Sequence, residues 1–177
     1  MNIIFYCPCA SKPTGGIRAI YDFCNVLKNN GFKAFIFHPI SSYRYKYTNK
    51  DISIYKGKYS KKGDHFVIPD VYVARPEFLN LYNNSNYSLL IQNPYIISAL
   101  NRFSDIDIIN KAFKNASKIL VISEDAKSLI LKQFPSALKK IIVLGWSMNC
   151  MQFSSFDFLE KEKIITYCGG GIAATNI

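Results

Sequence analysis

Apolar residues along the chain alternate between short continuous runs and longer amphipathic stretches. Short β-branched runs are typical of buried strands, whereas apolar residues spaced three and four positions apart indicate one face of a helix. Residues 3–7 form such a run, and a second run covers 33–37. Between them lies a helical stripe that consists of Ile17, Ile20, Tyr21, Cys24 and Leu27. It is followed by Asn30-Gly31, a pair that typically ends a helix. This order predicts a parallel strand-helix-strand unit.

The same alternation continues to about residue 145. Helical faces occur at 106–116 and 126–134, the second closed by Pro135. Further strand candidates are 66–68, 89–92, 118–123 and 140–145. The series predicts an α/β, Rossmann-like, doubly wound domain with a mainly parallel sheet.

The last residues repeat the opening pattern. Residues 163–168 are a strand-like run followed by three glycines, a combination that normally opens a nucleotide-binding βα unit. A chain of 177 residues, 49% apolar and 15% aromatic, is expected to bury one full core. We therefore expect one Rossmann-like domain over 1–160, and in 161–177 the first strand and turn of a second, truncated domain.

The formal charge of +10 is concentrated in residues 43–62. This segment holds seven Lys or Arg, five Tyr and a single acid, Asp51. Interleaved cations and aromatics can meet a phosphorylated substrate, an anionic membrane surface or single-stranded nucleic acid. An exposed loop or a protected edge strand has the same composition. The predicted basic patch consists of Lys56, Lys58, Lys61 and Lys62.

Several classes of protein are disfavoured. No apolar run approaches the roughly 20 residues of a membrane-spanning helix, and the first residues lack the pattern of a signal peptide. The five cysteines form no CxxC pair, which argues against a disulfide framework and a zinc site. We therefore expect a cytoplasmic protein without a metal.

In a doubly wound sheet, ligands bind at the carboxyl ends of the strands. The loop after the first strand carries Gly15 and Gly16, which allow close backbone approach, with Lys12 and Arg18 adding positive charge. It matches neither a dinucleotide fingerprint nor a Walker loop. A tight turn that requires glycine is the alternative interpretation.

Two later strand ends also carry polar groups. Gln92, Asn93 and Tyr95 follow the strand at 89–92 and can bind a hydroxyl-rich ligand, with Pro94 expected to prevent immediate helix formation. Ser123 and Glu124 follow the strand at 118–123. Turn chemistry at the first place and helix capping at the second are the alternatives.

Six stretches, in their order along the chain, resemble a known family: residues 13–39, 67–76, 89–98, 118–130, 139–153 and 161–170. They are similar to the amino-terminal domain, and then the first strand of the second domain, of GT-B glycosyltransferases of the retaining family 4 type. The Gly15-Gly16 loop and the strand that runs into Ser123-Glu124 carry much of the likeness. The histidine that many members use has no counterpart, because His38 and His65 lie elsewhere, so no catalytic residue is assigned.

The resemblance implies transfer of a sugar from a nucleotide diphosphate sugar to a glycan or lipid-linked acceptor, with no metal or other cofactor. The chain would be the acceptor-side domain, inactive alone, completed by a second domain or a homo-oligomer. Peripheral contact with the inner face of a membrane is a further option. The alternatives are a non-catalytic carbohydrate- or phosphate-binding module, including a partner of a separate donor domain, and a nucleic-acid-binding α/β protein.

Overall fold

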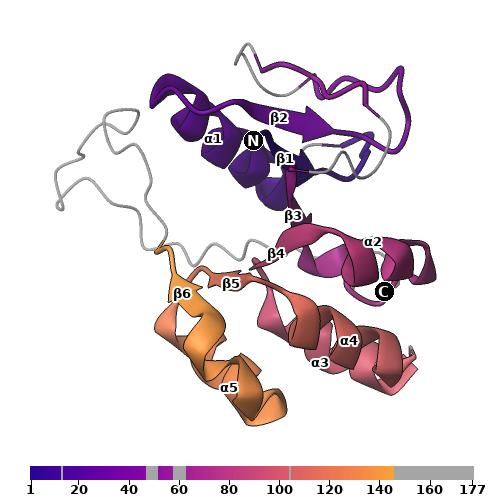
Figure 1. Ribbon diagram of the computed structural model, residues 1–177, viewed down its shortest axis with the longest axis vertical. Helices are drawn as coiled ribbons and strands as arrows, with labels where there is room; N and C mark the ends of the chain where they lie inside the picture. The colour runs from indigo at the N-terminus through magenta and orange to yellow at the C-terminus, as the bar shows by residue number, and fades with distance from the viewer. Residues whose placement is uncertain (13, 47–51, 58–62, 104, 146–177) are drawn as a thin grey trace, which may run out of the picture. The chain divides into compact units, whose positions relative to one another are not determined.

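A single parallel sheet organises the part of the chain that the computed structural model describes, residues 1–145 without 13, 47–51, 58–62 and 104. Within that part, the sheet has six strands in the order β2-β1-β3-β4-β5-β6, and Figure 1 shows them side by side. The strands are β1 Ile3–Tyr6, β2 Ala34–Phe37, β3 His65–Pro69, β4 Asn86–Ile91, β5 Lys118–Val121 and β6 Ile141–Val143. Every paired neighbour is parallel, which confirms the predicted α/β, Rossmann-like class.

The strand order creates a topological switch point. From β1 the chain moves outwards to β2, then returns to place β3 on the other side of β1. The loops that leave β1 and β3 therefore diverge to opposite faces of the sheet, and a crevice is expected between them at their carboxyl ends. This is the doubly wound arrangement that the alternation predicts.

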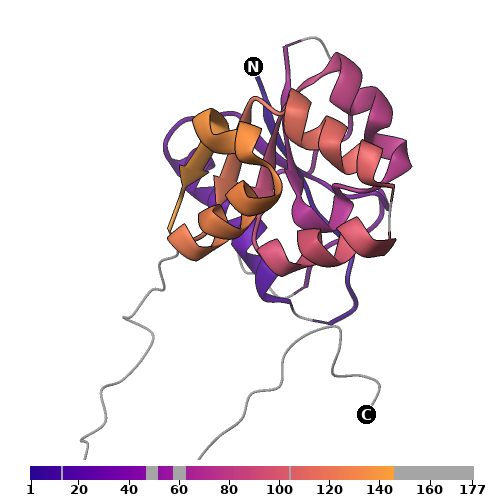
Figure 2. The ribbon, with the colours of Figure 1, turned by 90° about the horizontal axis from the view of Figure 1, so that it is seen from below.

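Helices cover both faces of the sheet, as Figures 1 and 2 show. Because successive strand residues point to opposite faces, Phe5 and Val67 pack with α1, whereas Ile4 and Phe66 share a core with α2, α4 and α5. The α-helices are α1 Gly15–Asn29, α2 Leu79–Asn84, α3 Pro94–Phe103, α4 Ile106–Asn115 and α5 Glu124–Gln133. Three short 3₁₀ helices join them in the described part: η1 Asp70–Tyr72, η2 Pro76–Phe78 and η3 Pro135–Lys140.

The ends of the helices follow local chemistry. The side chain of Thr14 caps α1 by accepting a hydrogen bond from the Ile17 N–H, and Gly31, at φ 83°, takes the left-handed conformation after the helix. Pro94 was expected to prevent immediate helix formation, but this prediction is wrong, because Pro94 is the first residue of α3. Proline suits the first turn because its ring fixes a helical φ and its missing N–H is not needed there.

Part of the basic segment extends the sheet. The Ile36 N–H donates to the Ser53 carbonyl at 3.1 Å, and the Tyr55 N–H donates to the Ile36 carbonyl at 2.7 Å. These bonds place Ile54 beside β2 in a parallel bridge. Residues 53–55 thus cover the outer edge of β2, as the edge-strand interpretation expects.

Two of the predicted regions lie outside the described residues. They are the start of a second domain at 161–177 and the lysines 58, 61 and 62 of the basic patch.

Among the helices that the structure does describe, none combines the length and the apolar character needed to cross a membrane.

Candidate functional site at the carboxyl ends of the strands

Two loops that the sequence singles out meet at the carboxyl edge of the sheet. Gln92 follows β4 and Gly16 lies in the first turn of α1, 76 positions away. The Gln92 side-chain Nε2 donates a hydrogen bond to the Gly16 carbonyl oxygen at 3.0 Å. The two loops leave β1 and β4, and β3 lies between these strands in the sheet order. The Gln92 amide therefore reaches past the end of β3 to the switch point between β1 and β3.

The contact leaves no room for a side chain at position 16 unless the Gln92 amide moves. A Cβ atom built on Gly16 would lie 2.9 Å from the Gln92 Oε1, closer than a normal contact. A Cβ atom on the neighbouring Gly15 would meet nothing within 4 Å. The two glycines therefore have different roles: Gly16 makes room for Gln92, and Gly15 leaves open space at the start of the helix.

The buried Asp70 carboxylate binds the backbone of the loop that carries Gln92. Its side chain is only 2% exposed. One carboxylate oxygen accepts hydrogen bonds from the backbone N–H groups of Gln92, at 2.9 Å, and Asn93, at 2.6 Å. The other accepts from the Val71 N–H at 2.9 Å. Burial raises the pKa of Asp70, while the three N–H donors act in the opposite direction.

Asp70 is the residue of this site that sequence reasoning missed. The signal that could have found it is an acid directly after a buried strand, because an isolated charge there needs several donors. Its bonds couple the end of β3 to the end of β4, which fixes the backbone from which Gln92 extends. The structure thus assigns Asp70 a positioning role.

Two tyrosines of the basic segment hold the loop after β1. The Tyr43 hydroxyl accepts from the Ala10 N–H at 3.1 Å and donates to the Ala10 carbonyl at 2.7 Å. The Tyr45 hydroxyl makes the same pair of bonds with the N–H and carbonyl of Thr14, at 3.3 and 3.4 Å. The aromatic residues at the start of this segment are therefore part of the wall beside Gly15.

A buried histidine lies behind the same loop. His38 is 3% exposed, its Nδ1 lies 3.0 Å from the Cys7 carbonyl, and its Nε2 lies 2.8 Å from the Tyr21 hydroxyl. This arrangement fits a neutral ring that donates from Nδ1 and accepts at Nε2. Burial lowers the pKa of His38 and raises the pKa of Tyr21. Both groups are buried and paired, so they stabilise the wall rather than exchange protons with a ligand.

The remaining predicted residues near the crevice are more exposed. Arg18 is exposed on α1, and Tyr95 is 61% exposed at the start of α3. The Asn93 side-chain oxygen accepts from the Tyr95 N–H at 3.1 Å, which turns the chain into α3. Lys56, the described member of the basic patch, is exposed beyond the edge of β2. Turn chemistry therefore accounts for Asn93, while Arg18 and Tyr95 are accessible to a ligand.

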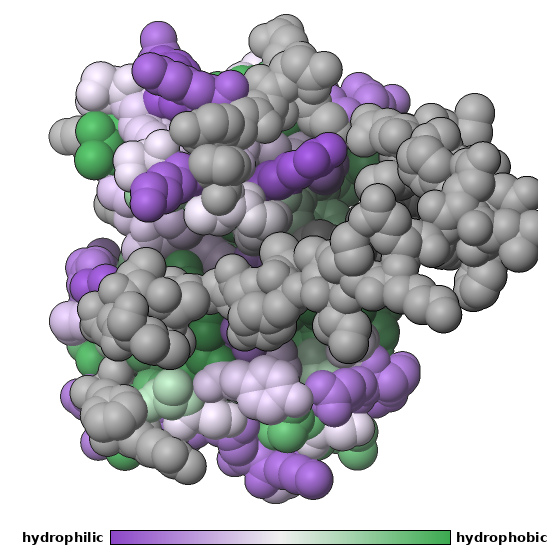
Figure 3. All heavy atoms as spheres, turned by 180° about the vertical axis from the view of Figure 1, so that it is seen from behind, coloured by the Kyte–Doolittle hydropathy of each residue, from purple (hydrophilic) through white to green (hydrophobic). Residues whose placement is uncertain are grey.

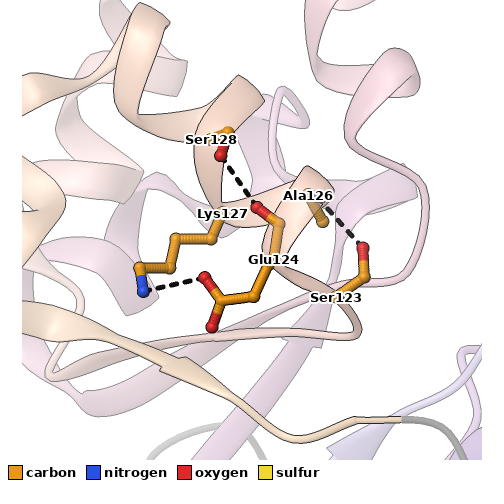
Figure 4. A network of polar contacts seen from close by, with 5 residues as sticks. All are labelled: Ser123, Glu124, Ala126, Lys127 and Ser128. Atoms are coloured by element: carbon orange, nitrogen blue, oxygen red, sulfur yellow. Dashed lines mark hydrogen bonds and ion pairs between the residues drawn. The ribbon is translucent and has the colours of Figure 1, made fainter.

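Ser123 and Glu124 have clear structural tasks, shown in Figure 4. The Ser123 hydroxyl caps α5 by accepting from the Ala126 N–H at 3.1 Å. The Glu124 carboxylate pairs with Lys127 Nζ at 2.9 Å, although 72% of its side chain is exposed. Both interactions favour the first turn of a helix. The Glu124 carboxylate nevertheless lies at the carboxyl end of β5 and can accept a further donor.

A pocket of about 570 Å³ opens beside η1, next to the end of β3. Its wall combines apolar and polar surface in similar amounts, with Arg75 and Asp105 as charged groups of opposite sign. The lining residues are Val71, Ala74, Arg75, Pro76, Leu100, Asp105 and Ile108. Its volume falls in the range of small-molecule sites, and it is partly open to solvent.

The face of the molecule that Figure 3 draws is mixed in character. Figure 3, seen from behind, shows strongly hydrophilic residues separated by pale and hydrophobic ones on the same face.

Within the described residues, no three His, Cys, Asp or Glu side chains are grouped as a metal site would require. Comparison with known protein families, curated proteins and solved structures found no match to this chain.

Proposed function

We propose that this domain is the acceptor-side half of a glycosyltransferase that uses a nucleotide diphosphate sugar. The observation that supports it most directly is the contact of Gln92 with Gly16 at the switch point. Ligands of doubly wound sheets bind at this position. The resemblance in the order of the six stretches supports the same class of enzyme.

The groups at this edge suit the two substrates. The amino end of α1 favours an anion, and Lys12 and Arg18 add positive charge beside it. The pocket beside η1 suits the acceptor, because the apolar part of its wall can hold a sugar face or an aliphatic group. Arg75 and Asp105 can then bind polar substituents.

Catalysis would need more than this domain supplies. Electrostatic stabilisation of the departing diphosphate is usually the largest contribution in such a reaction, and it is strongest where water is excluded. On the described domain, the cations nearest the glycine loop in sequence are Lys12 and Arg18, and both are exposed. We therefore expect weak nucleotide binding and no turnover from these 177 residues alone.

The test combines calorimetry with a transfer assay over a panel of UDP-, GDP- and dTDP-sugars. The chain is measured alone and then with the carboxyl-terminal domain of a GT-B enzyme added in trans. The control is Lys33→Gln, which removes an exposed charge between the end of α1 and β2. Weak binding would support the proposal if it is reduced in Arg18→Gln and kept in Lys33→Gln. Turnover by the isolated chain, or no binding of any nucleotide sugar, would contradict it.

The pocket beside η1 favours one second candidate, a non-catalytic carbohydrate- or phosphate-binding module. Such a module would bind its ligand through Arg75 and Asp105 without any nucleotide. Titration of a sugar and sugar-phosphate panel therefore separates the two functions. Tight binding that is lost in Arg75→Gln and insensitive to Arg18→Gln would favour the module.

A further inference from the structure

A group of lysines without acidic neighbours in the sequence lies at the amino ends of β5 and β6. Residues 108–123 and 126–145 contain no Asp or Glu. The end of α4, the start of β5, the end of α5 and all of η3 fall in these ranges. These ranges carry seven lysines, of which Lys127 pairs with Glu124. We call the other six the lysine face: Lys111, Lys114, Lys118, Lys132, Lys139 and Lys140.

Packing holds these elements together as one surface. Phe113, near the end of α4, stacks on Phe134, directly after α5, with ring centroids 3.9 Å apart and planes within 4°. The Lys140 ammonium donates to the Lys114 carbonyl and so joins η3 to α4. The lysine face is therefore built on a fixed support rather than on a loose loop.

Helix capping explains only part of this charge. Lys114 and Lys132 lie in the last turns of α4 and α5, where a cation favours the helix dipole, and Lys140 binds a terminal carbonyl. Lys118 and Lys139 are exposed and belong to no α-helix. Like charges gathered in this way repel each other, so an anionic partner would relieve a cost that the fold itself does not require.

We propose that the lysine face, together with Leu138, docks on an anionic membrane surface. Leu138 is 60% exposed in η3, directly before the exposed Lys139, and can enter the interfacial region of a bilayer. A nucleic acid fits less well, because stacking needs exposed rings. The aromatic residues of α4 and of the α5–η3 junction, Phe113 and Phe134, are buried against each other.

Docking at this surface would leave the proposed site free. The lysine face lies at the amino ends of the strands, whereas Gln92 and Gly16 meet at the carboxyl ends. The docking is independent of the proposed transferase activity, and it uses a different surface from residues 43–62.

The experiment is co-sedimentation of the full chain with phosphatidylcholine vesicles, with and without about 30% phosphatidylserine, at several salt concentrations. Each lysine near an anionic surface contributes roughly fivefold to partitioning. A variant in which four of these lysines are replaced by Gln should therefore bind the vesicles at least about tenfold more weakly. The replaced residues are Lys114, Lys118, Lys132 and Lys139. Leu138→Ser should weaken binding that remains at high salt, where charge attraction is screened over a few Å.

The matched control removes four exposed lysines elsewhere in the same way: Lys12, Lys33, Lys46 and Lys56. It should bind vesicles nearly as well as the unchanged chain. Equal or larger loss in this control would overturn the proposal, since net charge or the basic segment would then drive binding. Absence of binding to phosphatidylserine vesicles, or tighter binding to single-stranded RNA than to vesicles, would also overturn it. Circular dichroism of both variants checks that the fold is kept.

Discussion

The contact between Gln92 and Gly16 predicts an energetic coupling that can be measured. In Gly16→Ala, the new Cβ would lie 2.9 Å from Gln92 Oε1, so the flexible amide must move and release the Gly16 carbonyl. Loss of one such hydrogen bond costs about 1 kcal/mol. Alanine in a helix is favoured over glycine by up to about 1 kcal/mol. The two effects oppose each other, so Gly16→Ala alone should change the free energy of unfolding very little.

The same substitution should behave differently when the amide is absent. Gln92→Ala removes the hydrogen bond and should cost about 1 kcal/mol. Adding Gly16→Ala to that variant should then stabilise it by up to about 1 kcal/mol, because only the helix preference remains. The coupling energy of the double-mutant cycle is therefore expected near 1 kcal/mol.

Gly15→Ala is the matched control. A Cβ atom there meets nothing within 4 Å, so its effect should be the same with and without Gln92. Urea unfolding of the unchanged chain and the five variants, followed by far-ultraviolet circular dichroism, gives the required free energies. Each glycine substitution has a coupling energy with Gln92→Ala. If the coupling energies of Gly16→Ala and Gly15→Ala agree within about 0.3 kcal/mol, the reasoning from this contact is refuted.

Three further outcomes are expected. Asp70→Asn places an NH₂ group against backbone N–H donors and should cost about 2–4 kcal/mol in urea unfolding, whereas Asp105→Asn at the exposed cap of α4 should cost less than about 0.5 kcal/mol. Tyr43→Phe removes two hydrogen bonds to the loop after β1 and should lower the free energy of unfolding by about 1–2 kcal/mol, unlike Tyr95→Phe on the surface. Burial lowers the pKa of His38, so the unfolded chain takes up its proton first and stability should fall as the pH drops through 6.5. Unfolding measured across this range should depend less on pH in His38→Gln, and an unchanged pH dependence would contradict the buried, neutral ring.

Much of the fold could be predicted because its strands and long helices carry regular patterns. The stripe from Ile17 to Leu27 and the short apolar runs of β1 and β2 are unambiguous. The region from 70 to 103 was harder, since η1, η2 and the six-residue α2 are too short to show a helical period. Pro94 was misinterpreted because proline stops a helix in its interior but favours its first turn.

The candidate site could be predicted only as separate loops. Gly16 and Gln92 were both identified from their places after strands, but their contact depends on the strand order, which brings together residues 76 positions apart. Asp70 shows the same limit. Its importance comes from burial and from three N–H donors supplied partly by another loop, and no local pattern records either.

The Gln92 contact also constrains how a ligand can use this edge. The side-chain amide already donates to the Gly16 carbonyl, and its oxygen fills the space above the Gly16 Cα. A ligand that approaches this glycine must displace the amide, at a cost of about 1 kcal/mol, or replace the carbonyl as its partner. Gly15 has no such neighbour within 4 Å, so a ligand can approach the backbone there without this cost. An anionic ligand is therefore expected to contact the backbone at Gly15 first. The Gln92 amide would move only after that contact has formed.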